Sequence, residues 1–432
     1  MKTLIKDGYI YDPANRREGV HDIFIVGNKI IKVAKKIKEK ADRTIEASRM
    51  VVLPGLIDMH AHLREPGRED AETIETGLDS ASRGGFTSVC AMPNTTPCCD
   101  NQGVVELMLE KARNARLAHL FPIGAITKNR EGKELSEVGE LRHAGCVAVS
   151  DDGHSVKDSS LLRRAMEYSL MFDIPIISHC EDVGLSQEGV MHEGYVSTVL
   201  GMKGIPSASE SIIVARDLQL AEFTGARIHI AHVSSRESLD LIKHAKAKGV
   251  RVTCETCPHY LIFTDEDVRT FDTNFKMNPP LRTSEDREAL RQAVHDGTID
   301  VIATDHAPHI ESEKDVEFDY APFGIIGFET AVASLNTLLI RDKITDWNGI
   351  VELMSLHPAK ILGLDKGTLG EGKEADITII DPNERWVCTK DEIRSKSKNS
   401  PFIGFEFKGN VKYAMVSGHV TFGDVSLHRR SS

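Results

Sequence analysis

The sequence contains neither a long apolar run nor a basic block, and both absences narrow the possible functions. No uninterrupted apolar stretch approaches the roughly 18 residues that a membrane helix requires. The formal net charge is −12 and the positive charges are dispersed, which argues against binding the phosphate backbone of nucleic acids. The first residues, Met1 to Asp7, lack the apolar core of a secretory signal. We therefore expect a cytoplasmic protein that binds neither nucleic acid nor a membrane.

Cysteine is also scarce for a chain of this length. Eight cysteines in 432 residues do not provide the framework of a disulfide-rich secreted fold. Cys254 and Cys257 form a single C-x-x-C pair, but a second pair at zinc-ribbon spacing is missing. We therefore expect reduced thiols and no structural zinc at this pair.

What the sequence does contain is a repeated alternation of strand and helix patterns. The expected strands are Val51–Ile57, Thr87–Met92, Leu120–Ile126, Cys146–Ser150, Pro175–Ser178, Arg227–His232, Arg251–Glu255 and Asp300–Thr304. The helical patterns between them include Gln102–Arg113, Ser159–Met171, Ser209–Thr224, Ser235–Ala247 and Ser284–Asp296. Eight such repeats predict an α/β protein with a (β/α)8 barrel of the TIM type. A doubly wound sheet is the alternative, but it usually has fewer strands and often a glycine-rich phosphate turn, which this sequence lacks.

The two ends of the chain have a different, β-rich character. Short strand patterns occupy Thr3–Tyr11, His21–Val26 and Lys29–Val33 near the start, and Ala375–Ile380 and Val411–Val416 near the end. Neither end has enough strands for a stable sheet of its own, so we expect both to pair into one small β-sandwich domain. The predicted division gives residues 1–50 and 366–432 to this domain and residues 51–365 to the barrel. The polar stretch from Lys390 to Ser400 is expected to be a surface loop or a short helix.

Two histidines directly after the first barrel strand give the first indication of chemistry. His60 and His62 are two residues apart, so on an extended chain their side chains point the same way. They can therefore bind one metal ion, and neutral imidazole is the commonest nitrogen ligand of zinc. An isolated pair of this kind is more often an ordinary surface or core pair, by roughly two to one. Because polar groups also end the later strands, we favour a metal site here.

In a (β/α)8 barrel the active site forms at the carboxyl ends of the strands. The polar residues found there are Arg64, Asn94, Asp151, Asp152, His179, His232, His259, Asn278, Asp305, His306 and His309. Histidines and carboxylates at so many independent strand ends are difficult to explain by core packing. Nitrogen and oxygen ligands without thiolate suit a catalytic zinc ion or a pair of them.

Charge suggests how these residues could divide the work. Two neighbouring zinc ions require an anionic bridge, which Asp152 could supply together with hydroxide. Zinc lowers the pKa of bound water to about 7, so hydroxide becomes available at neutral pH. Asp305 could take the proton of the nucleophile and pass it to a leaving nitrogen. Arg64 and Asn94 could bind a substrate carboxylate, the arginine through its bidentate fork.

These motifs resemble those of the amidohydrolase superfamily and, within it, of the dihydroorotases. Pro54–His62 resembles the superfamily signature, while Leu63–Gly67 and Ala303–His309 are similar to dihydroorotase motifs in order, spacing and strand placement. The resemblance runs over nearly the whole chain. It implies the reversible cyclisation of N-carbamoyl-L-aspartate to L-dihydroorotate in pyrimidine synthesis, on a metal-dependent barrel beside a β-sandwich-like domain. A metal-bound hydroxide would be the nucleophile and Asp305 the general acid and base.

The resemblance also implies individual roles. Asp305 would bind one zinc with His60 and His62, and His179 and His232 would bind the second. Many relatives bridge the metals with a carboxylated lysine, whereas this chain resembles the subgroup that uses an aspartate, and spacing favours Asp152 over Asp151. One or two zinc ions are implied, with two favoured. Substrate contacts would come from His62, Arg64, Asn94, Asn278, His309 and the backbone of Phe323–Gly324.

Two other functions stay open at this stage. A hydantoinase or allantoinase would share the metals and the barrel, but Arg64, Asn94 and Asn278 suit a substrate with an α-carboxylate, which hydantoins lack. The absent bridging lysine also argues against a hydantoinase. A non-catalytic assembly subunit would usually have lost metal ligands, which this chain retains. A homodimer and association with aspartate carbamoyltransferase are compatible with the enzyme, and the polar loop Ile310–Phe323 could close over the substrate.

Overall fold

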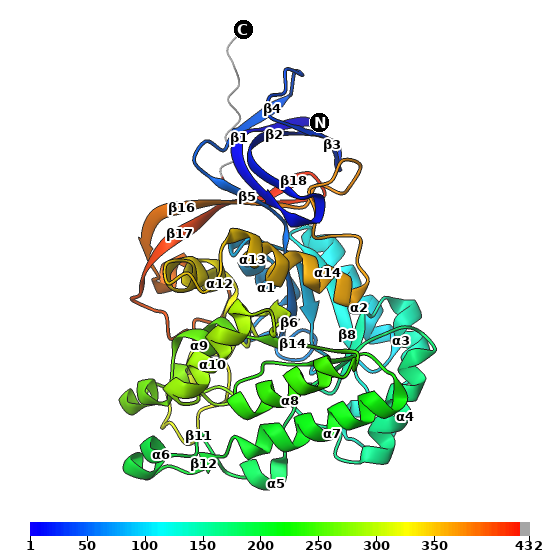
Figure 1. Ribbon diagram of the computed structural model, residues 1–432, viewed down its shortest axis with the longest axis vertical. Coiled ribbons are helices and arrows are strands. Elements are labelled where there is room, and N and C mark those ends of the chain that lie inside the picture. Colours follow the sequence, from blue (N-terminus) through cyan, green and yellow to red (C-terminus); the bar gives the residue numbers. More distant parts are fainter. Residues whose placement is uncertain (424–432) are drawn as a thin grey trace.

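The computed structural model describes residues 1–423, and its architecture has two parts (Figure 1). The barrel, with its helices outside the strands, makes up the larger part, and a sheet built from both chain ends lies at one end of it. The predicted α/β class with a (β/α)8 barrel is therefore confirmed. Among the described residues, none of the helices combines the length and the apolarity that crossing a membrane would require.

The barrel consists of eight parallel strands in sequence order. They are β6 (Leu56–Ala61), β7 (Phe86–Ala91), β8 (His119–Gly124), β9 (Ala148–Ser150), β10 (Ile176–Ser178), β13 (Ile228–Ile230), β14 (Val252–Thr256) and β15 (Val301–Ile302). The ring is closed between its first and last members by a parallel bridge from Ala61 to His306. The His62 amide also donates to the His306 carbonyl over 2.8 Å. All eight carboxyl ends consequently meet at one rim.

Asp58 strengthens this closure from inside β6. Its buried carboxylate accepts the backbone N–H groups of His60 and Thr304, at 3.0 and 3.1 Å, and the Thr304 hydroxyl. Burial raises the pKa of Asp58 to about 6, against the lowering effect of these hydrogen bonds. Thr304 directly precedes Asp305. The Asp58 side chain therefore fixes the register between the end of β6 that carries His60 and the end of β15 that leads to Asp305.

The outer layer contains α1 (Ile74–Arg83), α2 (Gln102–Ala115), α3 (Val138–Ala144), α4 (Ser159–Leu170), α7 (Ala208–Thr224), α8 (Arg236–Ala247), α10 (Ser284–His295), α12 (Phe328–Ser334), α13 (Trp347–Val351) and α14 (His357–Leu362). The five helices with predicted ranges, α2, α4, α7, α8 and α10, begin and end within two residues of those ranges. Several begin at a capping side chain that accepts a hydrogen bond from the first turn. These caps are Asn101, Asp158, Ser235 and Thr283. These capping side chains therefore stabilise the starts of the helices.

Strands from both chain ends pair into one mixed sheet, as expected. They are β1 (Lys2–Asp12), β2 (Arg17–Val26), β3 (Lys29–Ala34), β4 (Arg43–Glu46), β5 (Val51–Pro54), β16 (Ile377–Val387), β17 (Glu406–Val416) and β18 (His419–Phe422). The two ends meet where β5 pairs with β1 on one side and with β16 on the other. The division of the chain into residues 1–50, 51–365 and 366–432 stays a prediction.

One predicted strand is wrong. Val51–Ile57 is not a single barrel strand, because β5 belongs to the terminal sheet and β6 to the barrel. The chain changes sheets at Gly55, where a Cβ atom would lie only 2.1 Å from the Thr87 hydroxyl oxygen, so that only glycine fits. Both strands are completely buried, so an unbroken apolar run gave no sign of the crossing.

The expected surface loop at Lys390–Ser400 needs a second correction. A short 3-10 turn occupies Lys390–Glu392, but Ile393, Ser395, Ser397 and Asn399 are buried. We call residues 393–400 the β16–β17 connector, since they lead from the terminal sheet along the barrel rim and back. The small polar side chains of the connector are buried because barrel loops satisfy their hydrogen bonds, so their polarity did not indicate exposure to solvent.

Candidate metal centre and active site

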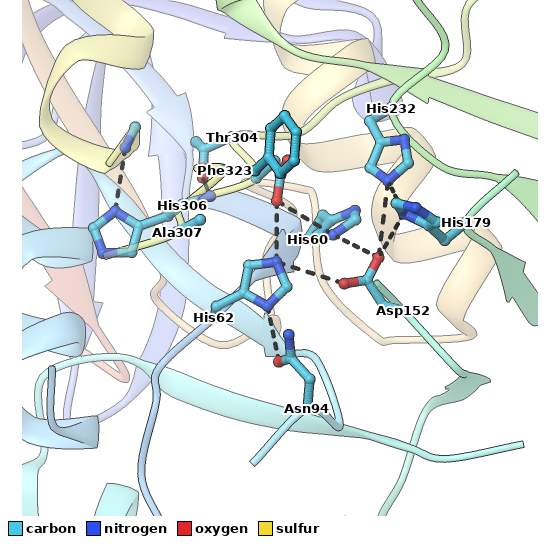
Figure 2. Close-up of polar contacts among 12 residues, drawn as sticks. His60, His62, Asn94, Asp152, His179, His232, Thr304, His306, Ala307 and Phe323 are labelled. Carbon is cyan, nitrogen blue, oxygen red and sulfur yellow. Dashed lines mark hydrogen bonds and ion pairs between the residues drawn. The ribbon is translucent and has the colours of Figure 1, made fainter. Parts of the chain in front are cut away.

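The six predicted metal ligands meet at the carboxyl rim of the barrel, and Figure 2 labels five of them, all except Asp305. They come from five different strand ends, and each is at most 8% exposed. His60 and His62 lie at the end of β6, Asp152 after β9, His179 after β10, His232 after β13 and Asp305 after β15. The strand ends therefore bring together residues that are far apart in the sequence, as the barrel prediction required.

His60, His62 and Asp305 form one candidate set of ligands. The Nε2 atoms of His60 and His62 lie 3.5 and 3.0 Å from Oδ1 of Asp305. Asn94 orients the second imidazole, because its Oδ1 accepts the Nδ1–H of His62 at 2.9 Å and thereby leaves Nε2 directed at the rim. These ligand atoms are mutually within 4.8 Å, close enough to hold one ion.

Asp152 lies between this set and the other two histidines (Figure 2). Its Oδ1 is 3.2 Å from Nε2 of His60, 3.7 Å from Nδ1 of His179 and 3.8 Å from Nε2 of His232. Its Oδ2 lies 3.6 Å from Nε2 of His62. One carboxylate therefore faces all four imidazoles, which is the placement that a bridging anion requires.

The neighbouring aspartate has different contacts. The Asp151 carboxylate accepts the backbone N–H of Thr127 at 2.9 Å and the Thr127 hydroxyl at 2.5 Å. It thus holds the loop after β8 rather than facing the histidines. Of the two adjacent aspartates, only Asp152 shares the rim with the imidazoles.

The chemistry of this cluster fits a metal ion. Nε2 of His60 and Oδ1 of Asp152 are buried, and neither has a hydrogen-bond partner among residues 1–423. Leaving such a group unsatisfied costs about 1–3 kcal/mol, and an ion between the two atoms would satisfy both. The donors are imidazole nitrogens and carboxylate oxygens without thiolate, a set that zinc accepts and that cobalt or manganese could also use.

Glu255, which the sequence analysis did not select, orients His60 from behind. Its Oε1 lies 2.7 Å from Nδ1 of His60, and its Oε2 lies 3.2 Å from Nε2 of His229. Burial would raise the pKa of Glu255, but the two histidines outweigh burial and keep this pKa far below its usual value. The Nδ1 proton of His60 is thereby fixed, and Nε2 stays available to a metal. Glu255 lies completely buried in strand β14, and no motif in the sequence marks it.

We expect Glu255→Gln to weaken metal binding by about 10- to 100-fold, because the ring of His60 loses its anionic hydrogen-bond acceptor. Competition with a chromophoric chelator measures this affinity. The matched control is Glu329→Gln, a buried glutamate that accepts the amides of Arg394 and Ser395 instead of a metal ligand. Equal affinities in Glu255→Gln and wild type would contradict the orienting role.

A second polar group lies beside the metal ligands and consists of the side chains of Arg64 and His309 and the backbone carbonyl of Phe323. Nε of Arg64 donates to the Pro308 carbonyl at 3.0 Å, and its Nη2 lies 3.3 Å from Nε2 of His309. Nε2 of His309 lies 2.8 Å from the Phe323 carbonyl. Burial, assisted by the charge of Arg64, lowers the pKa of His309 to about 2, so this imidazole is neutral. Burial lowers the pKa of Arg64 to about 10, which leaves the guanidinium charged at neutral pH.

The predicted backbone site at Phe323–Gly324 lies next to this group. Gly324 has a φ of +128°, and a Cβ atom there would come within 2.8 Å of the Ala307 side chain, so glycine is required. The loop that carries it is held by two buried lysines. Nζ of Lys276 donates to the carbonyls of Phe318 and Asp319, and Nζ of Lys314 to those of Pro322 and Gly324. These contacts order the last part of the predicted Ile310–Phe323 loop.

Asn278 lies on another side of the centre. Its Nδ2 donates to Oε2 of Glu181 at 3.0 Å, and the same oxygen lies 3.1 Å from Nε2 of His179. Glu181, which the sequence analysis did not select, therefore connects Asn278 to a candidate ligand. His306 points away from the cluster, since its Nδ1 accepts the Gly327 amide and its ring stacks on Phe328. His259 is buried, and its Nε2 has no partner in the described part of the chain.

Comparison with known proteins agrees with the fold. The family described as "Dihydro-orotase-like" matches residues 49–238, and the one described as "Amidohydrolase family" matches residues 214–422. The solved L-hydantoinase (dihydropyrimidinase) of Arthrobacter aurescens superposes with a TM-score of 0.89 at 25% identity, covering 98% of this chain and 97% of its own. The dihydropyrimidinase of Brevibacillus agri superposes with a TM-score of 0.86 at 22% identity, covering 98% of this chain and 95% of its own.

The barrel and its histidine–aspartate rim, with these matches, define an amidohydrolase, an enzyme that hydrolyses cyclic amides. The dihydroorotase of Acetivibrio thermocellus is 53% identical over 96% of this chain and 98% of its own length. The dihydroorotase of Citrifermentans bemidjiense is 51% identical over 98% of this chain and 100% of its own length. The chain therefore belongs to the dihydroorotase family, and the resemblance found in its motifs is confirmed.

Proposed function

We propose that this enzyme catalyses the reversible cyclisation of N-carbamoyl-L-aspartate to L-dihydroorotate, a step of de novo pyrimidine (UMP) synthesis. The observation that carries the substrate assignment is the guanidinium of Arg64. It is partly buried beside the candidate metal ligands, and no carboxylate of the described chain lies close enough to form an ion pair with it. Asp305, Asp152 and Glu313 stabilise the charge of Arg64 only from a distance, and the α-carboxylate of either substrate would supply a direct ion-pair partner. Hydantoins, which lack that group, would leave the guanidinium without such a partner.

The residues of the rim would hold one or two zinc ions. His60, His62 and Asp305 would bind the first, His179 and His232 the second, and Asp152 would be shared between them. When bound, zinc would polarise the amide carbonyl of the ring and lower the pKa of a water molecule so that hydroxide is available at neutral pH. The other substrate contacts are assigned to His62, Asn94, Asn278, His309 and the backbone of Phe323–Gly324, with Arg64 on the carboxylate.

Asp305 is the proposed general acid and base. Burial would raise the pKa of Asp305, but His60 and His62 outweigh burial and lower it to about 2, so the side chain is a carboxylate at neutral pH. In ring opening, Asp305 accepts the proton of the attacking water and delivers it to the leaving ring nitrogen. In ring closure the same carboxylate takes the proton from the carbamoyl nitrogen as this nitrogen attacks the side-chain carboxyl group of the substrate. Asp305 then passes this proton to the carboxyl oxygen whose C–O bond breaks, so that the oxygen leaves as hydroxide.

The test is hydrolysis of L-dihydroorotate by the purified protein, with the metal content measured on the same sample. We expect turnover with one or two zinc ions per chain, loss of turnover after chelation and recovery when zinc is returned. Hydantoin and allantoin are the comparison substrates, and turnover of these with none on dihydroorotate would overturn the proposal. Absence of both metal and activity on all three would favour the assembly role, or a partner that completes the site.

Three further expectations belong to this proposal. They are the cytoplasmic setting, a homodimer, and association with aspartate carbamoyltransferase. Closure of the Ile310–Phe323 loop over the substrate also stays a prediction. Lys276 anchors this loop at the Phe318 carbonyl and Lys314 anchors it at the Gly324 carbonyl, while Tyr320, between these two anchor points, is 80% exposed. Such a loop is compatible with closure.

A further inference from the structure

The β16–β17 connector, residues 393–400, contacts both loops that flank the active site. The Ser397 hydroxyl donates to the Ala71 carbonyl at 2.7 Å, and the Ser395 hydroxyl donates to Glu72, so this part of the connector is fixed to the loop after β6. The Asn399 side chain contacts the loop after β15. A segment of the terminal sheet therefore spans the rim between the His62–Arg64 side and the His309–Gly324 side.

Asn399 uses every polar group of its side chain in these contacts. Its Nδ2 donates to the carbonyls of Ala307 and Gly324 at 3.0 and 3.1 Å, and its Oδ1 accepts the backbone N–H of His309 at 3.1 Å. Its own carbonyl accepts the amide of Ile326 at 3.0 Å. The residue is 5% exposed, so water does not substitute readily for these partners.

These bonds join two chain segments that must be aligned for substrate binding. One segment is Ala307–His309 and the other is Gly324–Ile326. The Gly324 carbonyl is held twice, by Asn399 and by Nζ of Lys314, at 3.1 and 3.0 Å. The ring of His309 in turn contacts the Phe323 carbonyl and Arg64. A shift of either segment would therefore move His309 relative to the guanidinium.

We propose that Asn399 is a positioning residue for the carboxylate-binding side of the substrate pocket. It acts through His309 and Phe323–Gly324, and it is too well enclosed by backbone groups to touch the substrate itself. This inference rests on the proposed function of that side of the pocket. Only an amide offers two donors and one acceptor in this arrangement, because an aspartate would place a second oxygen against two carbonyl oxygens.

The experiment compares Asn399→Asp and Asn399→Ser with a matched control. The control is Asn336→Asp, since Asn336 is 8% exposed and its Nδ2 also donates to two carbonyls, those of Pro382 and Lys408 in the terminal sheet. We expect both Asn399 variants to raise KM for L-dihydroorotate by about 10-fold or more, with a smaller change in kcat and unchanged metal content. The control should lose comparable thermal stability and keep its KM.

Hydrogen–deuterium exchange supplies a second readout that does not depend on the substrate. In Asn399→Ser the shorter side chain removes the acceptor of the His309 amide, and in Asn399→Asp the acceptor oxygen is kept but the second carboxylate oxygen faces the carbonyls of Ala307 and Gly324. Peptides that contain His309 should therefore exchange faster in both variants than in wild type or in Asn336→Asp, and most in Asn399→Ser. Unchanged KM together with unchanged exchange would overturn the proposal. If wild type does not hydrolyse dihydroorotate, the proposed function fails, while the exchange of His309 still decides whether Asn399 orders this loop. If the aspartate variant does not fold, the serine variant decides the outcome.

Discussion

Replacing Asp305 by asparagine is expected to lower kcat for L-dihydroorotate hydrolysis by about 1,000-fold or more, the upper range for loss of a general acid and base. Asparagine preserves the shape and an oxygen directed toward His60 and His62, but it cannot accept a proton at neutral pH. KM should change much less, because Asp305 is not among the residues assigned to the substrate carboxylate. Steady-state kinetics on samples of known metal content measures both parameters.

The matched control is Asp300→Asn at the opposite end of the same strand. Asp300 pairs with Lys246 at 2.6 Å and accepts the Cys254 amide, so it stabilises the amino end of β15 without facing the rim. Substitution at that end should affect stability rather than turnover, since chemistry in this fold is confined to the carboxyl ends. Turnover of Asp305→Asn within a few-fold of wild type would refute the assigned role, whatever its metal content.

The candidate ligands could be found from the sequence because each is encoded locally. A strand pattern followed by a histidine or carboxylate is a short-range signal, and the barrel architecture then determines that all such ends share one rim. His179 and His232 are separated by 53 positions, yet they lie 2.8 Å apart between Nδ1 and Nε2. No pairwise information was required, because the fold class alone implies their proximity.

Residues that act through other residues could not be found in this way. Glu255 orients His60 across 195 positions, and Asn399 reaches His309 across 90, and neither is marked by a motif. Both are buried polar groups, and hydrogen-bond partners from distant segments offset the free-energy cost of burying them. Their polarity in the sequence therefore wrongly indicates exposure to solvent. The same reason explains why the β16–β17 connector was expected at the surface. The sheet change at Gly55 was missed for the opposite reason, since uniform burial on both sides leaves no periodicity to interrupt.

Asp152→Asn should release metal, whereas Asp151→Asn should not, although the two residues are adjacent and equally buried. A shared carboxylate offsets the repulsion between two cations, and a neutral amide at the same position cannot. We expect Asp152→Asn to lose at least one metal ion per chain and about 100-fold in kcat, a loss in the range found when the groups that support a metal are removed. Asp151→Asn weakens only the contacts with Thr127, so it should cost about 1 kcal/mol of folding free energy and leave metal and turnover near wild type.

The metal content per chain of the two variants therefore also reports how many ions the centre holds. If wild type contains two ions and Asp152→Asn retains one, that ion belongs with His60, His62 and Asp305, whose atoms approach one another without Asp152. If Asp152→Asn loses all its metal, neither set of histidines is sufficient alone, and the carboxylate facing all four imidazoles is the group on which the centre depends. Equal metal loss in Asp151→Asn and Asp152→Asn would contradict the bridging role, because only the Asp152 carboxylate faces the imidazoles, while that of Asp151 is bound to Thr127.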